Sequence, residues 1–291
     1  MMPGEKKLSV REVRCNSLLH PLSYRYFLEY TANLYHGCTH ACDYCYAPSL
    51  IHDERDWGKY VDVKINAPQV LRSELSRLKK RVVFLSSAFD PYQPVEAKYR
   101  ITRNCLEILQ SKKFPVLILT RSPLILRDLD ILEKFDWLRV GFSISSLAEK
   151  YHEPGVVPLE KRISALSKLG ERKITTWVSL APIVPGLPMI NFETLFQKLK
   201  ECGVSAVSPG LLRFNGYAES KRMFEERSNS KFADALVGCE VMNTINQLSR
   251  SCDLDDTDFV LSWTDPEEDR AIDSYSAFGP IHSSEPVKLE K

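Results

Sequence analysis

The chain has 291 residues, of which 44% are hydrophobic and 26% are charged, and its formal net charge is +1. The composition is that of an ordinary globular protein. The net charge near zero excludes a basic surface over the whole protein of the kind that binds nucleic acid, but it is compatible with a local basic groove. The eight cysteines do not amount to a disulfide scaffold, and the sequence shows neither an apolar signal segment nor a run approaching the ~18 apolar residues of a membrane span. We therefore expect a cytoplasmic protein with no membrane partner.

Residues 1–27 are charged and irregular and predict an N-terminal extension with one short strand. Short β-branched runs, typical of buried parallel strands, then alternate with helical patterns. The predicted strands are Tyr26–Tyr35, Val82–Ser86, Val116–Thr120, Val140–Ser145, Thr176–Ala181 and Val204–Leu211. The predicted helices are 66–80, 102–112, 123–134, 158–169 and 192–202. This α/β alternation predicts a parallel sheet with right-handed crossovers.

The alternating pattern gives way to a different one near residue 215, so we expect the main domain to span residues 28–215. Residues 216–266 predict a helical or mixed extension, with a helix over Lys221–Arg250 and a short strand over Phe259–Trp263. The polar residues 267–291 predict a disordered tail.

Three closely spaced cysteines, Cys38, Cys42 and Cys45, directly follow the first predicted strand. Iron–sulfur clusters are bound by cysteine thiolates, usually four, so three thiols in one loop suggest a cluster with one iron left open for a ligand. Structural zinc is the alternative, since Cys3His sites are common and His36, His40 or His52 could supply the fourth ligand. Zinc motifs usually come as two separated ligand pairs, and no second pair follows here.

The C-x3-C-x2-C spacing, with the aromatic Tyr44 before the third cysteine, resembles the signature of the radical SAM superfamily. The resemblance implies a partial (β/α)6 TIM-type barrel with a [4Fe-4S] cluster on Cys38, Cys42 and Cys45. It further implies that S-adenosylmethionine (SAM) chelates the open iron and that an electron, supplied by a reductant such as flavodoxin or ferredoxin, releases a 5′-deoxyadenosyl radical.

Small polar residues follow successive predicted strands, where the working residues of such barrels lie. By the family pattern, Ser86 and Ser87 contact the methionine amino group of SAM, and Ser143 and Ser145 contact its ribose or carboxylate. The apolar segment 181–186, which contains Ile183 and Val184, resembles the one whose backbone reads the adenine edge. Read singly, each serine is as well explained as a loop hydroxyl or a helix cap.

Several further stretches resemble the spore-photoproduct-lyase-like group of radical SAM proteins, over roughly residues 8–215. They are NLYHGCTHACDYCYAP, 57–66, 89–96, 119–128 and APIVPGLP. Within them, segment 89–96 suggests a lid over substrate or SAM, with Asp90 and Tyr92 as candidate catalytic residues. Tyr46 matches a tyrosine that the group places beside the radical path, and simple packing explains it equally well.

The sequence departs from the group at one functional position. Spore photoproduct lyases use a cysteine hydrogen-atom donor near the end of the second strand, and residues 86–90 of this chain read SSAFD. Direct repair of thymine photoproducts is therefore not expected. Cys105 and Cys202 fall on apolar helix faces and are predicted to be buried thiols.

The leading hypothesis is thus a radical SAM enzyme whose substrate could be a nucleic acid base. The basic residues of the central region are offset by nearby acidic ones, so nucleic-acid binding depends on the resemblance. The alternatives are radical modification of a peptide, tRNA or small metabolite, and a non-catalytic metal-binding module.

Overall fold

The computed structural model describes residues 7–24, 27–148, 152–184, 187–212 and 217–228, together with 243–245, 247 and 250 near the C-terminus. A seven-stranded sheet forms the centre of the molecule, in the order β10-β9-β8-β7-β6-β3-β2. Its strands are β10 (Ala206–Leu211), β9 (Thr176–Ile183), β8 (Leu138–Ile144), β7 (Val116–Thr120), β6 (Val83–Leu85), β3 (Phe27–Ala32) and β2 (Leu19–Tyr24). All neighbours from β3 to β10 pair in parallel, and β2 pairs antiparallel with β3. The predicted six-stranded parallel arrangement is confirmed.

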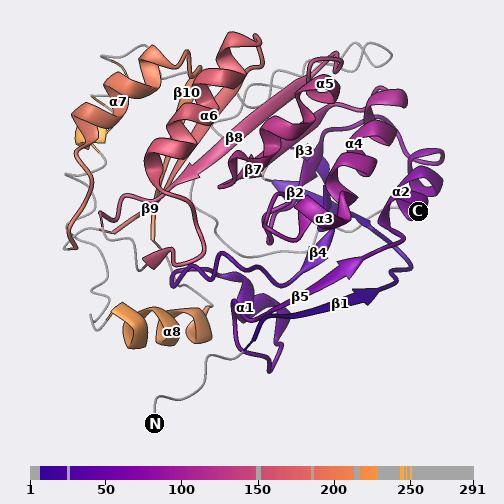
Figure 1. Cartoon of the computed structure of the whole chain (residues 1–291), viewed down its shortest axis with the longest axis horizontal. Coiled ribbons are helices and arrows are strands. Elements are labelled where there is room, and N and C mark those ends of the chain that lie inside the picture. Colours follow the sequence, from indigo (N-terminus) through magenta and orange to yellow (C-terminus); the bar gives the residue numbers. More distant parts are fainter. Residues whose placement is uncertain are drawn as a thin grey trace.

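Helices follow one another in an arc outside this sheet (Figure 1). They are α2 (Ala67–Leu75), α3 (Glu96–Tyr99), α4 (Ile101–Ser111), α5 (Leu129–Leu132), α6 (Leu159–Glu171) and α7 (Phe192–Glu201). Each of the longer ones buries one apolar stripe, as an amphipathic crossover helix must. In α4 that stripe includes Cys105, which is fully buried as predicted.

The expected helix over 123–134 is divided into a 3-10 helix, η1 (Pro123–Asp128), and the short α5. Asp128 at the junction is fully buried and accepts hydrogen bonds from Arg103 and Arg127, which fixes the chain there. The helix expected to reach residue 80 ends at Leu75, where the hydroxyl of Ser76 donates to the Ser73 carbonyl at 2.6 Å. Local side-chain bonds of this kind compete with helix continuation.

A second, three-stranded sheet was not predicted. It consists of β1 (Ser9–Val13), β5 (Tyr60–Lys64) and the two-residue β4 (Tyr35–His36), in the order β1-β5-β4. Helix α1 (Ala47–Ile51) lies beside it, and α8 (Ala218–Ser228) packs on α1 (Figure 1).

The N-terminal extension contributes two strands rather than one, because β2 joins the large sheet. The expected strand over Phe259–Trp263 and the tail 267–291 lie outside the described residues. In the described part of the chain, no helix combines the length and apolar character needed to span a membrane.

Candidate functional site

The cysteine loop, residues 37–46, joins β4 to α1 and lies at the carboxyl edge of the large sheet. The segments that follow β6, β7, β8 and β9 all contact this loop. An apolar cluster holds Cys42 and Tyr44 together with residues that follow β8, β9 and β10 and one residue of α8, namely Leu147, Val156, Val184, Leu212 and Phe224. This edge is where parallel α/β barrels place their working residues.

The three thiols of the loop are neighbours, and those of Cys38 and Cys42 are shielded from water. Cys38 and Cys42 are 6% and 5% exposed, and Cys45 is half-buried. Burial, with charge repulsion between the thiols as a further cause, raises the pKa of Cys38, Cys42 and Cys45 to about 12 each. The metal-free thiols are therefore protonated at neutral pH, and binding a metal centre would displace their protons. The soft donor set suits an iron–sulfur cluster.

Two of the three histidines proposed as zinc ligands already have other side-chain partners. His36 Nε2 lies 3.0 Å from Asp53, and His40 lies 3.0 Å from the Gly155 carbonyl and 3.1 Å from Asp90. His52 ends α1 in a left-handed conformation. Across the described ranges, no three His, Cys, Asp or Glu side chains, those of the three loop cysteines included, converge on a single ion position.

Asp90 connects the cysteine loop to two strands from a buried position. Its carboxylate accepts hydrogen bonds from Thr120 Oγ1 and Arg121 N at 2.6 Å each, and from Tyr92 N at 2.8 Å, while His40 of the cysteine loop lies on its other side. Burial alone would raise the pKa of Asp90, but His40 and these donors outweigh it and lower the pKa. Asp90 is thus an ionised anchor at the carboxyl ends of β6 and β7.

The expectation of a lid over residues 89–96 is wrong, because this segment lies in the interior. Tyr92, Gln93 and Glu96 are fully buried, and the Tyr92 hydroxyl donates to Asp128 at 3.1 Å. Burial raises the pKa of Tyr92 well above its ordinary value, so this phenol is a packed structural donor. A hydrophilic segment can be buried in this way only if its polar groups find partners, as these do.

A buried ionic cluster lies beside Cys42. Glu153 accepts hydrogen bonds from the Tyr44 hydroxyl, from Arg121 at 3.3 Å and from Arg162 at 3.1 Å. Burial would raise the pKa of Glu153, but Arg162 and Arg121 outweigh it and lower the pKa. The Arg121 guanidinium also lies 6.0 Å from the Tyr44 ring centre. Sequence reasoning missed Glu153 and Arg162, which stand outside any recognised motif.

The serines after β6 lie at the same edge. Ser86 is buried in a left-handed conformation, with φ of 67°, and its hydroxyl has no hydrogen-bond partner among the described residues. Ser87 accepts hydrogen bonds from Thr31 at 2.9 Å and Asn33 at 3.4 Å. An unpaired buried hydroxyl is costly, and it favours Ser86 as a contact for a bound molecule.

The ends of β8 and β9 are joined through serine hydroxyls. Ser145 Oγ accepts from Leu147 N at 3.1 Å, and Ser146 Oγ accepts from Val184 N at 3.2 Å. Ser143 is buried, and its carbonyl accepts from Arg162 at 2.9 Å. Ile183 and Val184 are both buried at this edge. Ser145 therefore serves the local backbone, and Ser146, which the sequence did not single out, joins the two strand ends.

Tyr46 is the most accessible of the candidate residues, with 38% of its surface exposed. Its hydroxyl donates to the Ser87 carbonyl, and its ring lies 5.8 Å from that of Tyr217. It thus links the cysteine loop to the segment after β6.

Gly155, in the segment after β8, packs directly on the cysteine loop. A Cβ at this position would lie 2.0 Å from the Thr39 carbonyl oxygen and 2.7 Å from His40 Cα, both backbone atoms. We expect Gly155→Ala to displace the loop, at an overpacking cost of ~1–3 kcal/mol, and to lower the iron content after reconstitution. Gly170→Ala is the matched control, because its Cβ would lie 2.5 Å from the Cys202 carbonyl at the other end of the strands. Equal iron loss in both variants would contradict a specific effect on the loop.

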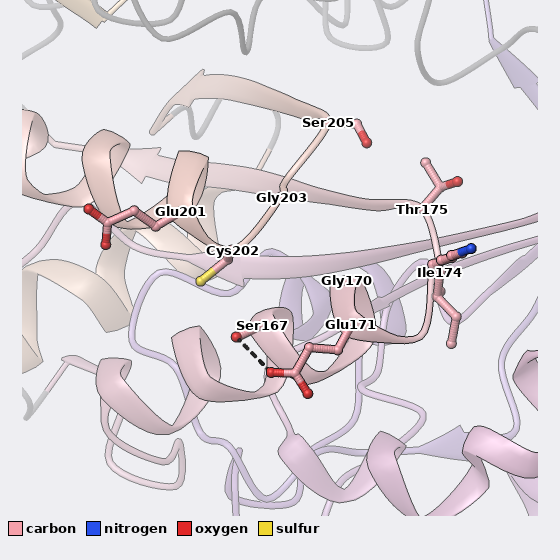
Figure 2. Close-up of a pocket in the computed structure, with 10 residues that line it drawn as sticks. Ser167, Gly170, Glu171, Ile174, Thr175, Glu201, Cys202, Gly203 and Ser205 are labelled. Atoms are coloured by element: carbon pink, nitrogen blue, oxygen red, sulfur yellow. Dashed lines mark hydrogen bonds between the residues drawn. The ribbon is translucent and has the colours of Figure 1, made fainter.

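A surface hollow of about 410 Å³ is lined by the ends of α6 and α7 and by the residues that precede β9 and β10 (Figure 2). Ile174 and Thr175 precede β9, and Ser205 precedes β10, so this hollow lies at the amino ends of the strands. Cys202 also lines it and is half-buried, so the prediction of a buried thiol is wrong for this residue. Residues at this end of a barrel generally serve stability.

Fold and site together define an α/β partial-barrel protein with a three-cysteine loop at the carboxyl edge of its sheet. A family model described as the radical SAM superfamily matches residues 32–199. The chain belongs to this superfamily.

Two curated relatives span different parts of this similarity. An uncharacterized protein of Methanocaldococcus jannaschii, MJ0683, is 37% identical over 169 residues, which cover 56% of this chain and 64% of the relative. A protein of Pseudomonas phage M6 named radical SAM Nalpha-GlyT isomerase is 26% identical over 195 residues, which cover 65% of this chain and 40% of the relative. The chain thus spans less than two thirds of the length of either relative.

Among solved structures, spore photoproduct lyase complexed with dinucleoside spore photoproduct has a TM-score of 0.65 to this chain. The superposition covers 86% of this chain and 84% of the lyase, at 17% sequence identity. The likeness establishes a shared fold, in agreement with the partial barrel expected from the sequence.

Proposed function

We propose that Cys38, Cys42 and Cys45 hold a [4Fe-4S] cluster whose open iron binds SAM. The observation that carries the proposal is the group of three neighbouring thiols, two buried and one half-buried, at the carboxyl edge of a radical SAM barrel. When bound, the cluster and SAM supply a 5′-deoxyadenosyl radical for hydrogen abstraction, a reaction that no side chain provides. A reductant such as flavodoxin or ferredoxin would deliver the electron.

The segments around the loop would bind and shield SAM. Ser86 offers an unpaired buried hydroxyl, and Ser87, Ser143 and Ser145 line the same edge. Tyr44, which is hydrogen-bonded to Glu153, would pack against the cluster. The buried backbone of Ile183 and Val184 would contact the adenine edge of SAM. Tyr46 is the candidate for a side chain beside the radical path, because it is accessible from solvent. Asp90 and Tyr92 would not contact SAM; their buried hydrogen bonds would hold the cysteine loop and the strand ends in place.

A nucleoside-containing substrate is the best-supported choice. The support is the likeness of fold to a lyase solved with a dinucleoside photoproduct, together with the similarity to the phage protein named Nalpha-GlyT isomerase. Radical modification of a peptide, a tRNA or a small metabolite is the alternative within the same chemistry.

Anaerobic reconstitution tests the proposal. We expect about four irons and four sulfides per chain and dithionite-dependent release of 5′-deoxyadenosine from SAM. A chain that binds metal and never cleaves SAM would instead be a non-catalytic binding module. Product analysis after incubation with DNA, RNA and cell extract would then identify the substrate class.

We expect no restoration of thymines from dinucleoside spore photoproduct, although SAM is cleaved. The reason is that residues 86–90 carry no thiol to return a hydrogen atom. Chromatography of the dinucleotide products, with 5′-deoxyadenosine measured in the same sample, provides the readout. Repair would show that another group, such as Tyr46 or Cys239, acts as donor. Binding to undamaged DNA should be weak and fall steeply with salt, because phosphate contacts would supply its affinity.

A further inference from the structure

Gln93 is a fully buried side chain that bonds the cysteine loop on both sides of Cys38. Its Oε1 accepts a hydrogen bond from Thr39 N, and its Nε2 donates to the Gly37 carbonyl, both at 3.1 Å. One amide group therefore satisfies the backbone immediately before and immediately after a ligand residue. Since buried backbone groups need partners, this arrangement fixes the local conformation of the loop.

The segment that contains Gln93 is itself held in place by hydrogen bonds. Gln93 N donates to the Asp90 carbonyl at 3.4 Å, and Glu96 N donates to the Gln93 carbonyl at 2.9 Å, which forms a tight turn. The Asp90 side chain in turn bonds Thr120 and Arg121 at the end of β7. Gln93 is thus anchored to the sheet and not to a free loop.

The opposite side of the loop rests on β5. Gly37 has φ of +92°, and a Cβ there would lie 2.4 Å from the Tyr60 carbonyl oxygen. The backbone around Cys38 is therefore enclosed between Tyr60 on one side and Gln93 on the other.

We infer that Gln93 is a positioning residue that holds Cys38 ready to bind metal in the chain before any metal is present. This inference rests on the proposed cluster site. A ligand whose backbone is fixed in advance loses less conformational freedom when the metal binds, and supporting hydrogen bonds of this kind determine how well a metal site is formed.

Alkylation of the metal-free, full-length chain tests this directly. Gln93→Met keeps the side-chain volume and removes both hydrogen bonds. We expect iodoacetamide to modify Cys38 about thirtyfold faster in this variant. The loss of two ordinary hydrogen bonds from the closed loop raises the population of the open loop, in which Cys38 is accessible, by about this factor. Mass spectrometry would follow Cys38 and Cys105 in the same sample. Cys105 is fully buried in α4 and reports global unfolding, so its rate should not change relative to the wild type.

Asp128→Asn is the matched control. Asp128 is equally buried and bonds Tyr92, Arg103 and Arg127, none of which belongs to the cysteine loop. We expect this variant to lose stability and to expose Cys38 and Cys105 together. The inference is overturned if Gln93→Met leaves the rate at Cys38 unchanged or raises it only in step with Cys105.

Reconstitution provides a second readout. At equal folded fraction, Gln93→Met should hold less iron, and the electron paramagnetic resonance g-values of its reduced cluster should shift from those of the wild type. Wild-type iron content and an unchanged spectrum would also overturn the inference. If the wild-type chain itself never takes up a cluster, the proposed function fails, and the alkylation experiment still decides whether Gln93 orders the loop.

Discussion

Replacing Cys38, Cys42 or Cys45 by alanine should abolish both iron retention and reductive cleavage of SAM. Each thiolate would hold one iron, and the other cysteines described, Cys15, Cys105 and Cys202, lie outside the loop. A cluster deprived of one of its three protein ligands has two exposed irons, and no fourth cysteine of the loop can replace the loss. Iron and sulfide per folded chain, and 5′-deoxyadenosine by chromatography, are the measurements.

Cys105→Ser and Cys202→Ser are the controls for this series. Cys105 is buried in α4, and Cys202 lines the hollow at the amino ends of the strands. Both variants should keep the iron content and SAM cleavage of the wild type. Normal iron in any one of the three loop variants, or loss of the cluster from a folded control, would contradict the ligand assignment.

Replacing Glu153 by alanine should destabilise the metal-free protein by ~3–5 kcal/mol, since it leaves buried cationic partners without their carboxylate. Arg162 and Glu153 are 7% and 10% exposed in their side chains, and Arg121 is the second cation of the cluster. Denaturant unfolding followed by circular dichroism would measure the change. Glu133→Ala is the control, because Glu133 pairs with Arg172 on the surface and such pairs contribute ~0–1 kcal/mol. Equal losses in the two variants would contradict the argument.

The Glu153 contribution should also depend on pH. Its folded-state pKa is depressed, because Arg162 and Arg121 outweigh the effect of burial. A carboxylate whose pKa is lowered in the folded state contributes its full stabilisation at pH values above its unfolded-state pKa, which is about 4.3 for glutamate. This contribution is lost as the pH falls through the lower folded-state pKa. The stability gap between wild type and Glu153→Ala should therefore stay constant from neutral pH down to about 5 and narrow below about 4. A gap that grew on acidification would contradict the ion-pair explanation.

The sequence alone determined the superfamily and the main architecture. Both are local properties of the chain, since the spacing of Cys38, Cys42 and Cys45 falls within one loop and the strand and helix patterns repeat over a few residues. The six parallel strands and the superfamily followed from these patterns. The small sheet escaped prediction because β4 has only two residues and because β5 pairs with β1, which lies far from it in the sequence.

Only the tertiary structure decided how the loop is held. Tyr44 and Glu153 are 109 residues apart in the chain, and His40 and Gly155 are 115 residues apart, so no local pattern joins them. The same reason explains the error over residues 89–96, whose polar composition predicts an exposed segment. Asp90, Gln93 and Glu96 are buried because their partners come from distant strands and loops, and burial of polar groups depends on such partners rather than on the residues themselves.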